Sequence, residues 1–172
     1  MQTQKDRSRA YRAALCAILT AIMLVLGFVE SLLPAGPIPG IKLGLSNSLL
    51  VCAIYILGIP TSFLLMILKV TLSGFLFGSV SAMMYAFAGG LLSMIVMSLL
   101  SRVKGIHTVV VSMAGGMMHN VGQVALAMWI LETPRLVFYM AVLMAVGLVC
   151  GAVSGVCADR VRHLMMSGMP QR

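Results

Sequence analysis

Long apolar blocks follow one another along this chain, separated only by short polar or Pro- and Gly-containing connections. An α-helix needs about 20 such residues to cross the hydrocarbon core of a bilayer. The blocks therefore predict an all-α integral membrane protein with six transmembrane helices, at about 11–33, 45–57, 60–77, 79–100, 107–131 and 134–161. The second block is short for a full crossing, so we expect it to be tilted or extended by part of the preceding connection. No linker separates the blocks, so residues 1–172 are expected to form a single transmembrane domain.

The composition agrees with this pattern and excludes a soluble protein. Of the 172 residues, 60% are apolar and only 9% charged, and the mean hydropathy is +1.06. Soluble domains carry about a quarter charged residues. The net charge of +8 could indicate a nucleic-acid partner. However, the basic residues stand at the ends of apolar blocks, where they determine membrane orientation. We therefore expect no nucleic acid as a partner.

Counting Lys and Arg by connection predicts the orientation. With the N-terminus inside, the inner side holds Lys5, Arg7, Arg9, Arg12, Arg102, Lys104, Arg160, Arg162 and Arg172. The outer side holds only Lys42 and Arg135, while Lys69 lies within a predicted span. Cytoplasmic connections carry the excess of positive charge in membrane proteins. Both termini are therefore expected to be cytoplasmic.

Polar residues within the spans gather between the membrane midplane and its outer third. Ionisable groups at this depth are costly and usually face the bundle interior. The pattern indicates a pocket open to the outside, in which cationic groups would attract a carboxylate or phosphate and amides would supply directional hydrogen bonds. The candidate substrate-binding residues are Glu30, Lys42, Asn47, Lys69, Ser73, Tyr85, His119, Asn120 and Gln123.

Structural alternatives remain open for several of these residues. Lys69 could pair with Glu30 only to hold two helices together. His119, Asn120 and Gln123 could serve as interhelical hydrogen-bonding groups. Lys42 could be an interfacial anchor. The Pro- and Gly-rich connection at 34–42 is either a lid over the pocket or a plain turn.

A stripe of small residues marks the first predicted span. Ala13, Ala17 and Ala21 are spaced by four residues in its cytoplasmic half. Such a stripe allows two helices to approach closely. It predicts either a docking surface for a partner membrane protein or internal packing.

Several catalytic signatures are absent from the sequence. There is no Walker A motif for a nucleotide, and the only Asp residues, Asp6 and Asp159, stand near the termini. No magnesium-diphosphate motif can be built from them, and no Ser-His-Asp or metal-ligand pattern occurs. We therefore expect no enzymatic activity, no cofactor and no metal.

Three motifs resemble those of a small bacterial membrane family described as Gx transporter or heptaprenyl diphosphate synthase component I. They are Pro39-Gly-Ile-Lys-Leu-Gly-Leu-Ser-Asn47 after Glu30-Ser31, Lys69-Val-Thr-Leu-Ser-Gly74, and Gly115-Gly-Met-Met-His-Asn-Val-Gly-Gln123. The motifs cover about 27–123, and the number of spans extends the resemblance over the whole chain. The family is similar to the substrate-binding S components of energy-coupling factor (ECF) transporters.

The resemblance implies an ECF S-component-like bundle of six helices in the bacterial cell membrane, with an outward pocket and a first-loop lid. Ala13, Ala17 and Ala21 match the small-residue motif with which many S components meet the transmembrane T subunit. Two cytoplasmic ATPases would complete the transporter, and the substrate would be a small anionic or vitamin-like solute. The alternative is a non-catalytic membrane subunit that anchors a prenyl diphosphate or quinone biosynthetic enzyme. A membrane enzyme acting on a lipid is a third hypothesis.

Overall fold

The computed structural model describes residues 2–32 and 45–167, and the regular elements in these ranges are all α-helices. The all-α architecture predicted from the apolar blocks is therefore confirmed. In chain order the helices are α1 Gln2–Leu32, α2 Leu45–Ser48, α3 Leu50–Leu57, α4 Ile59–Phe77, α5 Val80–Leu100, α6 Thr108–Leu131 and α7 Leu136–Ser167.

Five of these helices are long and apolar enough to cross a bilayer, which makes the chain a multi-pass membrane protein. They are the segments Arg9–Leu32, Ile59–Phe77, Val80–Leu100, Thr108–Leu131 and Leu136–His163. The short second block forms α2 and α3, which Leu49 separates. The sharp turn from α3 to α4 depends on Gly58, whose φ of +89° is open to glycine but strained for other residues.

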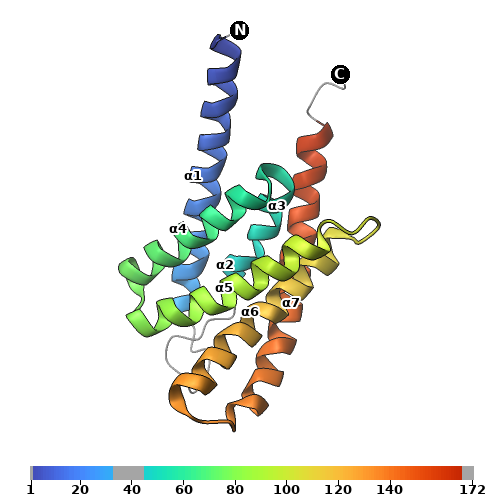
Figure 1. Cartoon of the computed structure of the whole chain (residues 1–172). Helices are drawn as coiled ribbons and strands as arrows, with labels where there is room; N and C mark the ends of the chain where they lie inside the picture. Colours follow the sequence, from blue (N-terminus) through green and yellow to red (C-terminus); the bar gives the residue numbers. More distant parts are fainter. Residues whose placement is uncertain (1, 33–44, 168–172) are drawn as a thin grey trace.

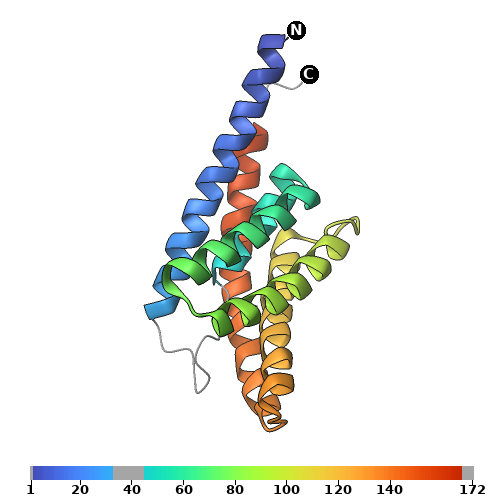
Figure 2. The same cartoon turned by 60° about the vertical axis from the view of Figure 1, so that its left-hand side comes forward.

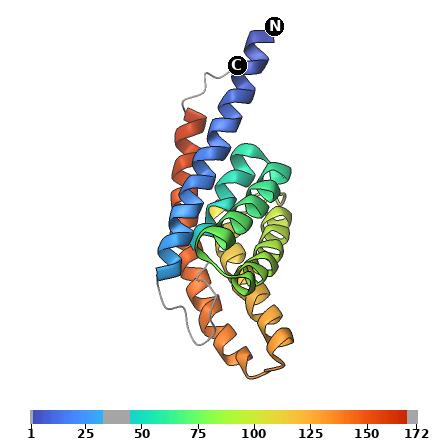
Figure 3. The same ribbon diagram turned by 90° about the vertical axis from the view of Figure 1, so that its left-hand side faces the viewer.

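The path of the chain brings its two ends to the same side of the bundle. Figure 1 shows that α1 begins and α7 ends at one end, which we call the terminal end. The connection between α6 and α7 lies at the opposite end. The rotated views in Figure 2 and Figure 3 agree on this placement. This arrangement fits the expectation that both termini lie on one side of the membrane.

Glycines allow α6 and α7 to pack with their backbones nearly in contact. A Cβ added at Gly116 would overlap the carbonyl oxygen of Gly147, and one added at Gly151 would lie 2.6 Å from the carbonyl oxygen of Ser112. Small residues at such crossings increase van der Waals contact, which drives helix association in lipid. The α6–α7 pair therefore forms the most closely packed part of the bundle.

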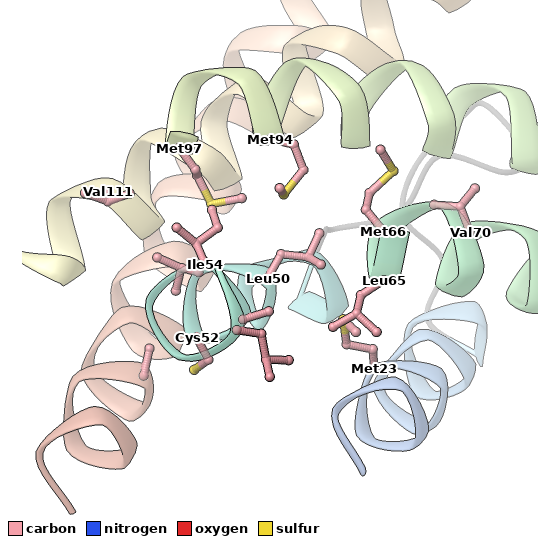
Figure 4. Packing of buried hydrophobic residues seen from close by; sticks show 14 residues of the cluster. Met23, Leu50, Cys52, Ile54, Leu65, Met66, Val70, Met94, Met97 and Val111 are labelled. Atoms are coloured by element: carbon pink, nitrogen blue, oxygen red, sulfur yellow. The ribbon is translucent and has the colours of Figure 1, made fainter. Parts of the chain in front are cut away.

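The short helix α3 lies at the centre of the hydrophobic core (Figure 4). Its Leu50 and Ile54 are buried in this core. Met94 and Met97 of α5 cover them on one side, and other helices lie on the opposite side. Methionine side chains are flexible and fill irregular gaps well. This packing holds α3, and α2 just before it, inside the bundle.

Basic side chains fix helices at the terminal end of the bundle. Arg12 of α1 donates from Nη2 to the carbonyl oxygen of Leu57, 3.0 Å away, and so caps the last turn of α3. Arg162 of α7 donates to Thr108 Oγ1 at 3.1 Å, and its guanidinium carbon lies 5.0 Å from the centre of the Tyr55 ring. These contacts tie together α1, α3, α6 and α7.

Candidate ligand-binding site

Asn47 of α2 joins a lysine and a histidine from two other helices. Lys69 Nζ of α4 donates to Asn47 Oδ1 at 2.7 Å. Asn47 Nδ2 lies 2.6 Å from Nδ1 and 2.8 Å from Nε2 of His119 on α6. We call Lys69, Asn47 and His119 the polar triad. All three were predicted site residues, and the structure brings them into direct contact across α2, α4 and α6.

The chemistry of lysine sets the direction of every hydrogen bond in the polar triad. An ammonium group only donates, so the amide oxygen of Asn47 must face Lys69. The amide nitrogen then faces His119 and can only donate. A ring nitrogen of His119 must therefore accept, which requires a neutral imidazole in this arrangement. The polar triad thus places one cation beside two neutral groups.

The polar triad is buried within the bundle. The exposed fractions are 4% for Lys69, 2% for Asn47 and 2% for His119. Holding an ammonium at membrane depth costs about 2.5–3.5 kcal/mol on insertion scales. The hydrogen bond that Lys69 donates to Asn47 offsets part of this cost. A positive charge maintained there is typical of a functional site.

A second contact connects α1 to the same region. Glu30 Oε2 accepts a hydrogen bond from Ser46 Oγ at 2.9 Å, and the Ser46 backbone nitrogen lies 3.5 Å from the same oxygen. Ser46 directly precedes Asn47, so α2 carries both contacts. The sequence analysis did not select Ser46, although it stands inside the motif that ends at Asn47.

Asn120 and Gln123 follow His119 on α6, and Asn120 connects this helix with α7. Asn120 Nδ2 donates to the carbonyl oxygen of Leu143 at 2.5 Å, and Gln123 Nε2 donates to Asn120 Oδ1 at 3.5 Å. Both side chains are fully buried. The contact to Leu143 supports the interhelical hydrogen-bonding interpretation for Asn120.

The other predicted site residues differ in their surroundings. Ser73 is buried and donates to the Val70 carbonyl oxygen of its own helix at 3.4 Å. Tyr85 is buried in an apolar cluster with Val124 and Leu143. Lys42 and the connection at 34–42, predicted as an anchor or ligand and as a lid, lie outside the described residues. Within the described ranges, no group of three or more His, Cys, Asp or Glu could hold a metal ion.

The alanine stripe lies on the outer surface of the described chain. Ala13, Ala17 and Ala21 are all exposed. The buried positions of α1, such as Met23 and Glu30, lie on another face of the helix. Internal packing within this chain therefore does not explain the stripe.

Comparison with known proteins identifies a related family. The family model described as heptaprenyl diphosphate synthase component I matches residues 19–161. No curated protein and no solved structure matches the chain. The matched range contains the polar triad and the helices that support it.

Proposed function

The chain belongs to the heptaprenyl diphosphate synthase component I family, and we propose that it is the substrate-binding S component of an ECF-type transporter that takes up a small anionic or vitamin-like solute. The observation that carries this proposal is the polar triad, in which a buried lysine, an asparagine and a histidine from three helices meet inside a membrane bundle. An anionic ligand would form an ion pair with the Lys69 ammonium group. Such pairing is much stronger in a dry interior than in water.

The chemistry of the polar triad favours binding over catalysis. His119 and Asn47 offer directional hydrogen bonds, and Lys69 offers charge. Synthesis of a prenyl diphosphate requires Mg²⁺, which binds carboxylates and substrate phosphates. The described residues hold no suitable group of carboxylates. The protein therefore acts as a non-enzymatic subunit in this proposal.

The exposed alanine stripe supports a membrane partner. Flat small-residue surfaces suit close helix contact in lipid, where van der Waals packing drives association. In this proposal, Ala13, Ala17 and Ala21 meet the transmembrane T subunit of an ECF module in the bacterial cell membrane. Two cytoplasmic ATPases supply the energy for transport, because this chain has no nucleotide-binding motif of its own.

The alternative function is a non-catalytic membrane subunit that anchors a prenyl diphosphate biosynthetic enzyme. The family description favours it, because "component I" implies partnership with another subunit. The same description names a diphosphate with an isoprenoid chain, so an isoprenoid phosphate is also a candidate ligand for the first function. Co-purification separates the alternatives, since the partner is an ECF module in one and a prenyltransferase in the other.

Replacing Ala17 by Leu is expected to disrupt association with the T subunit and to leave ligand binding unchanged. The larger side chain would hold the partner helix away from the α1 surface, while the polar triad lies elsewhere in the bundle. Co-purification of the complex from membranes, together with a ligand-binding measurement on the isolated chain, checks both parts of this prediction.

The control is Ala125→Leu, which makes the same change at an exposed position of α6. We expect this variant to retain both the partner and the ligand. If Ala17→Leu and Ala125→Leu behave alike, the alanine stripe is not the docking surface.

A further inference from the structure

A pocket of about 430 Å³ opens toward the terminal end of the bundle, between the turn from α3 to α4 and the end of α5. Its polar side chains are Tyr55, Ser101 and Arg102, and isoleucine and proline side chains form the rest of the wall. The volume falls within the range of about 300–1,000 Å³ that is usual for small-ligand pockets. None of the lining residues belongs to the polar triad, so this is a separate feature of the molecule.

Three arginines from distant parts of the sequence surround the pocket. Arg102 lines it directly. Arg12 of α1 donates to the carbonyl oxygen of Leu57, at the start of the turn that forms the wall. Arg162 of α7 places its guanidinium carbon 5.0 Å from the centre of the Tyr55 ring. The pocket therefore lies in a region of concentrated positive charge.

Arg102 is the member of this group that is available to a ligand. Arg12 and Arg162 are engaged within the bundle by hydrogen bonds to Leu57 and Thr108. Arg102 is exposed, and its guanidinium makes no hydrogen bond or ion pair with the residues that the structure describes. The described lining of the pocket contains no carboxylate that could neutralise it. A guanidinium presents a planar fork of N–H donors that fits a phosphate group.

An exposed apolar surface continues from the pocket along α4. Pro60 lines the pocket, and Leu64 and Leu68 follow it at intervals of four residues, so the three side chains share one helix face. Leu64 is 63% exposed and Leu68 is 42% exposed. Both belong to a helix that is long and apolar enough to cross a bilayer. A phosphate held in the pocket would therefore stand at the end of a surface suited to hydrocarbon chains.

We propose that the pocket binds the headgroup of an anionic phospholipid from the cytoplasmic leaflet, such as phosphatidylglycerol. The lipid phosphate pairs with Arg102, and the acyl chains lie against the exposed face of α4. The distribution of Lys and Arg predicts that this end of the bundle is cytoplasmic. Anionic lipids give that side of the membrane a negative surface potential, and basic pockets between transmembrane helices there bind anionic headgroups. The site does not depend on the proposed function.

The apolar face of α4 distinguishes a phospholipid from other sources of negative charge. A soluble phosphate ester would reach Arg102 but would gain nothing from Leu64 and Leu68. An acidic protein segment would have to bring apolar surface of its own to cover these leucines. A phospholipid supplies both parts, because its headgroup lies at the membrane interface and its chains lie in the hydrocarbon.

The test is native mass spectrometry of the full chain in detergent with three probes, namely phosphatidylglycerol, phosphatidylcholine with the same acyl chains, and glycerol 3-phosphate. The pocket variant is Arg102→Gln. Its control is Lys104→Gln, which removes the same charge from the same connection at a position outside the pocket lining. Both side chains are exposed, so both variants are expected to fold.

We expect phosphatidylglycerol to bind more tightly than phosphatidylcholine. Arg102→Gln should weaken the tightest phosphatidylglycerol binding by about fivefold, the equivalent of about 1 kcal/mol for one basic residue beside an anionic headgroup. Lys104→Gln should leave this binding unchanged, and glycerol 3-phosphate at equal concentration should not displace the lipid.

Three results would overturn the proposal. If the two variants lose phosphatidylglycerol equally, the lipid is attracted to the basic surface in general and the pocket is not its site. If phosphatidylcholine binds as tightly as phosphatidylglycerol, the headgroup charge is not recognised. If glycerol 3-phosphate displaces the lipid, the pocket binds a soluble phosphate ester instead.

Discussion

Replacing Lys69 by Met is expected to abolish measurable binding of the anionic ligand while leaving the protein folded. The substitution keeps an unbranched side chain of similar length and removes the positive charge. Removing one partner of a buried charge pair costs about 2–5 kcal/mol of binding free energy. Titration of the purified variant with its ligand, or with phosphate as a probe, checks the prediction.

The stability of the same variant separates a binding role from a structural one. Lys69 is 4% exposed and donates to Asn47. Met fills nearly the same space and removes a charge whose insertion costs about 2.5–3.5 kcal/mol, so the variant should remain folded with a cooperative thermal transition. The control is Lys104→Met, an exposed lysine between α5 and α6. If both variants bind the ligand normally, Lys69 is not the anion site. If Lys69→Met unfolds, the lysine holds helices together instead.

Replacing Gly116 by Ala is expected to produce the largest loss of stability. The added Cβ would overlap the carbonyl oxygen of Gly147. The oxygen belongs to the backbone, and the position of a Cβ is fixed by its own backbone, so neither atom can rotate away. Overpacking typically costs about 1–3 kcal/mol, and a backbone obstacle places this variant at the upper end. Thermal unfolding in detergent, followed by circular dichroism, measures the effect.

The matched control for this prediction is Gly27→Ala. A Cβ at Gly27 meets its nearest neighbour, a Phe77 ring carbon, at 3.8 Å, which is ordinary van der Waals contact. Since alanine is favoured over glycine in helices by about 0.5–1 kcal/mol, this variant should be slightly more stable than the parent. Equal effects of the two substitutions would mean that α6 and α7 do not cross at Gly116 and Gly147.

The sequence predicted the helical architecture well because membrane helices follow from local composition. An apolar block long enough to cross a bilayer must satisfy its backbone hydrogen bonds internally, and a helix does so. The division of the second block into α2 and α3 could not be predicted in this way. The division comes directly after Ser46 and Asn47, whose side chains contact residues distant in the sequence.

The candidate site was partly predictable for a related reason. Ionisable residues inside apolar blocks stand out, because placing them in a membrane costs free energy. Lys69, Glu30 and His119 were therefore found from sequence. The contact between Asn47 and His119 could not be predicted, because these residues are 72 positions apart in the sequence. Sequence also left two roles open for the alanine stripe and for Asn120. Exposure of the stripe argues against internal packing within this chain, and the contact of Asn120 with Leu143 is an interhelical hydrogen bond.

The most direct test of the proposed function is native mass spectrometry of the gently purified chain and of its Lys69→Met variant, each released from detergent. We predict that the parent protein carries a small anionic molecule and that the variant carries none. An empty parent protein that co-purifies with a prenyltransferase would contradict the proposal and favour the anchoring subunit.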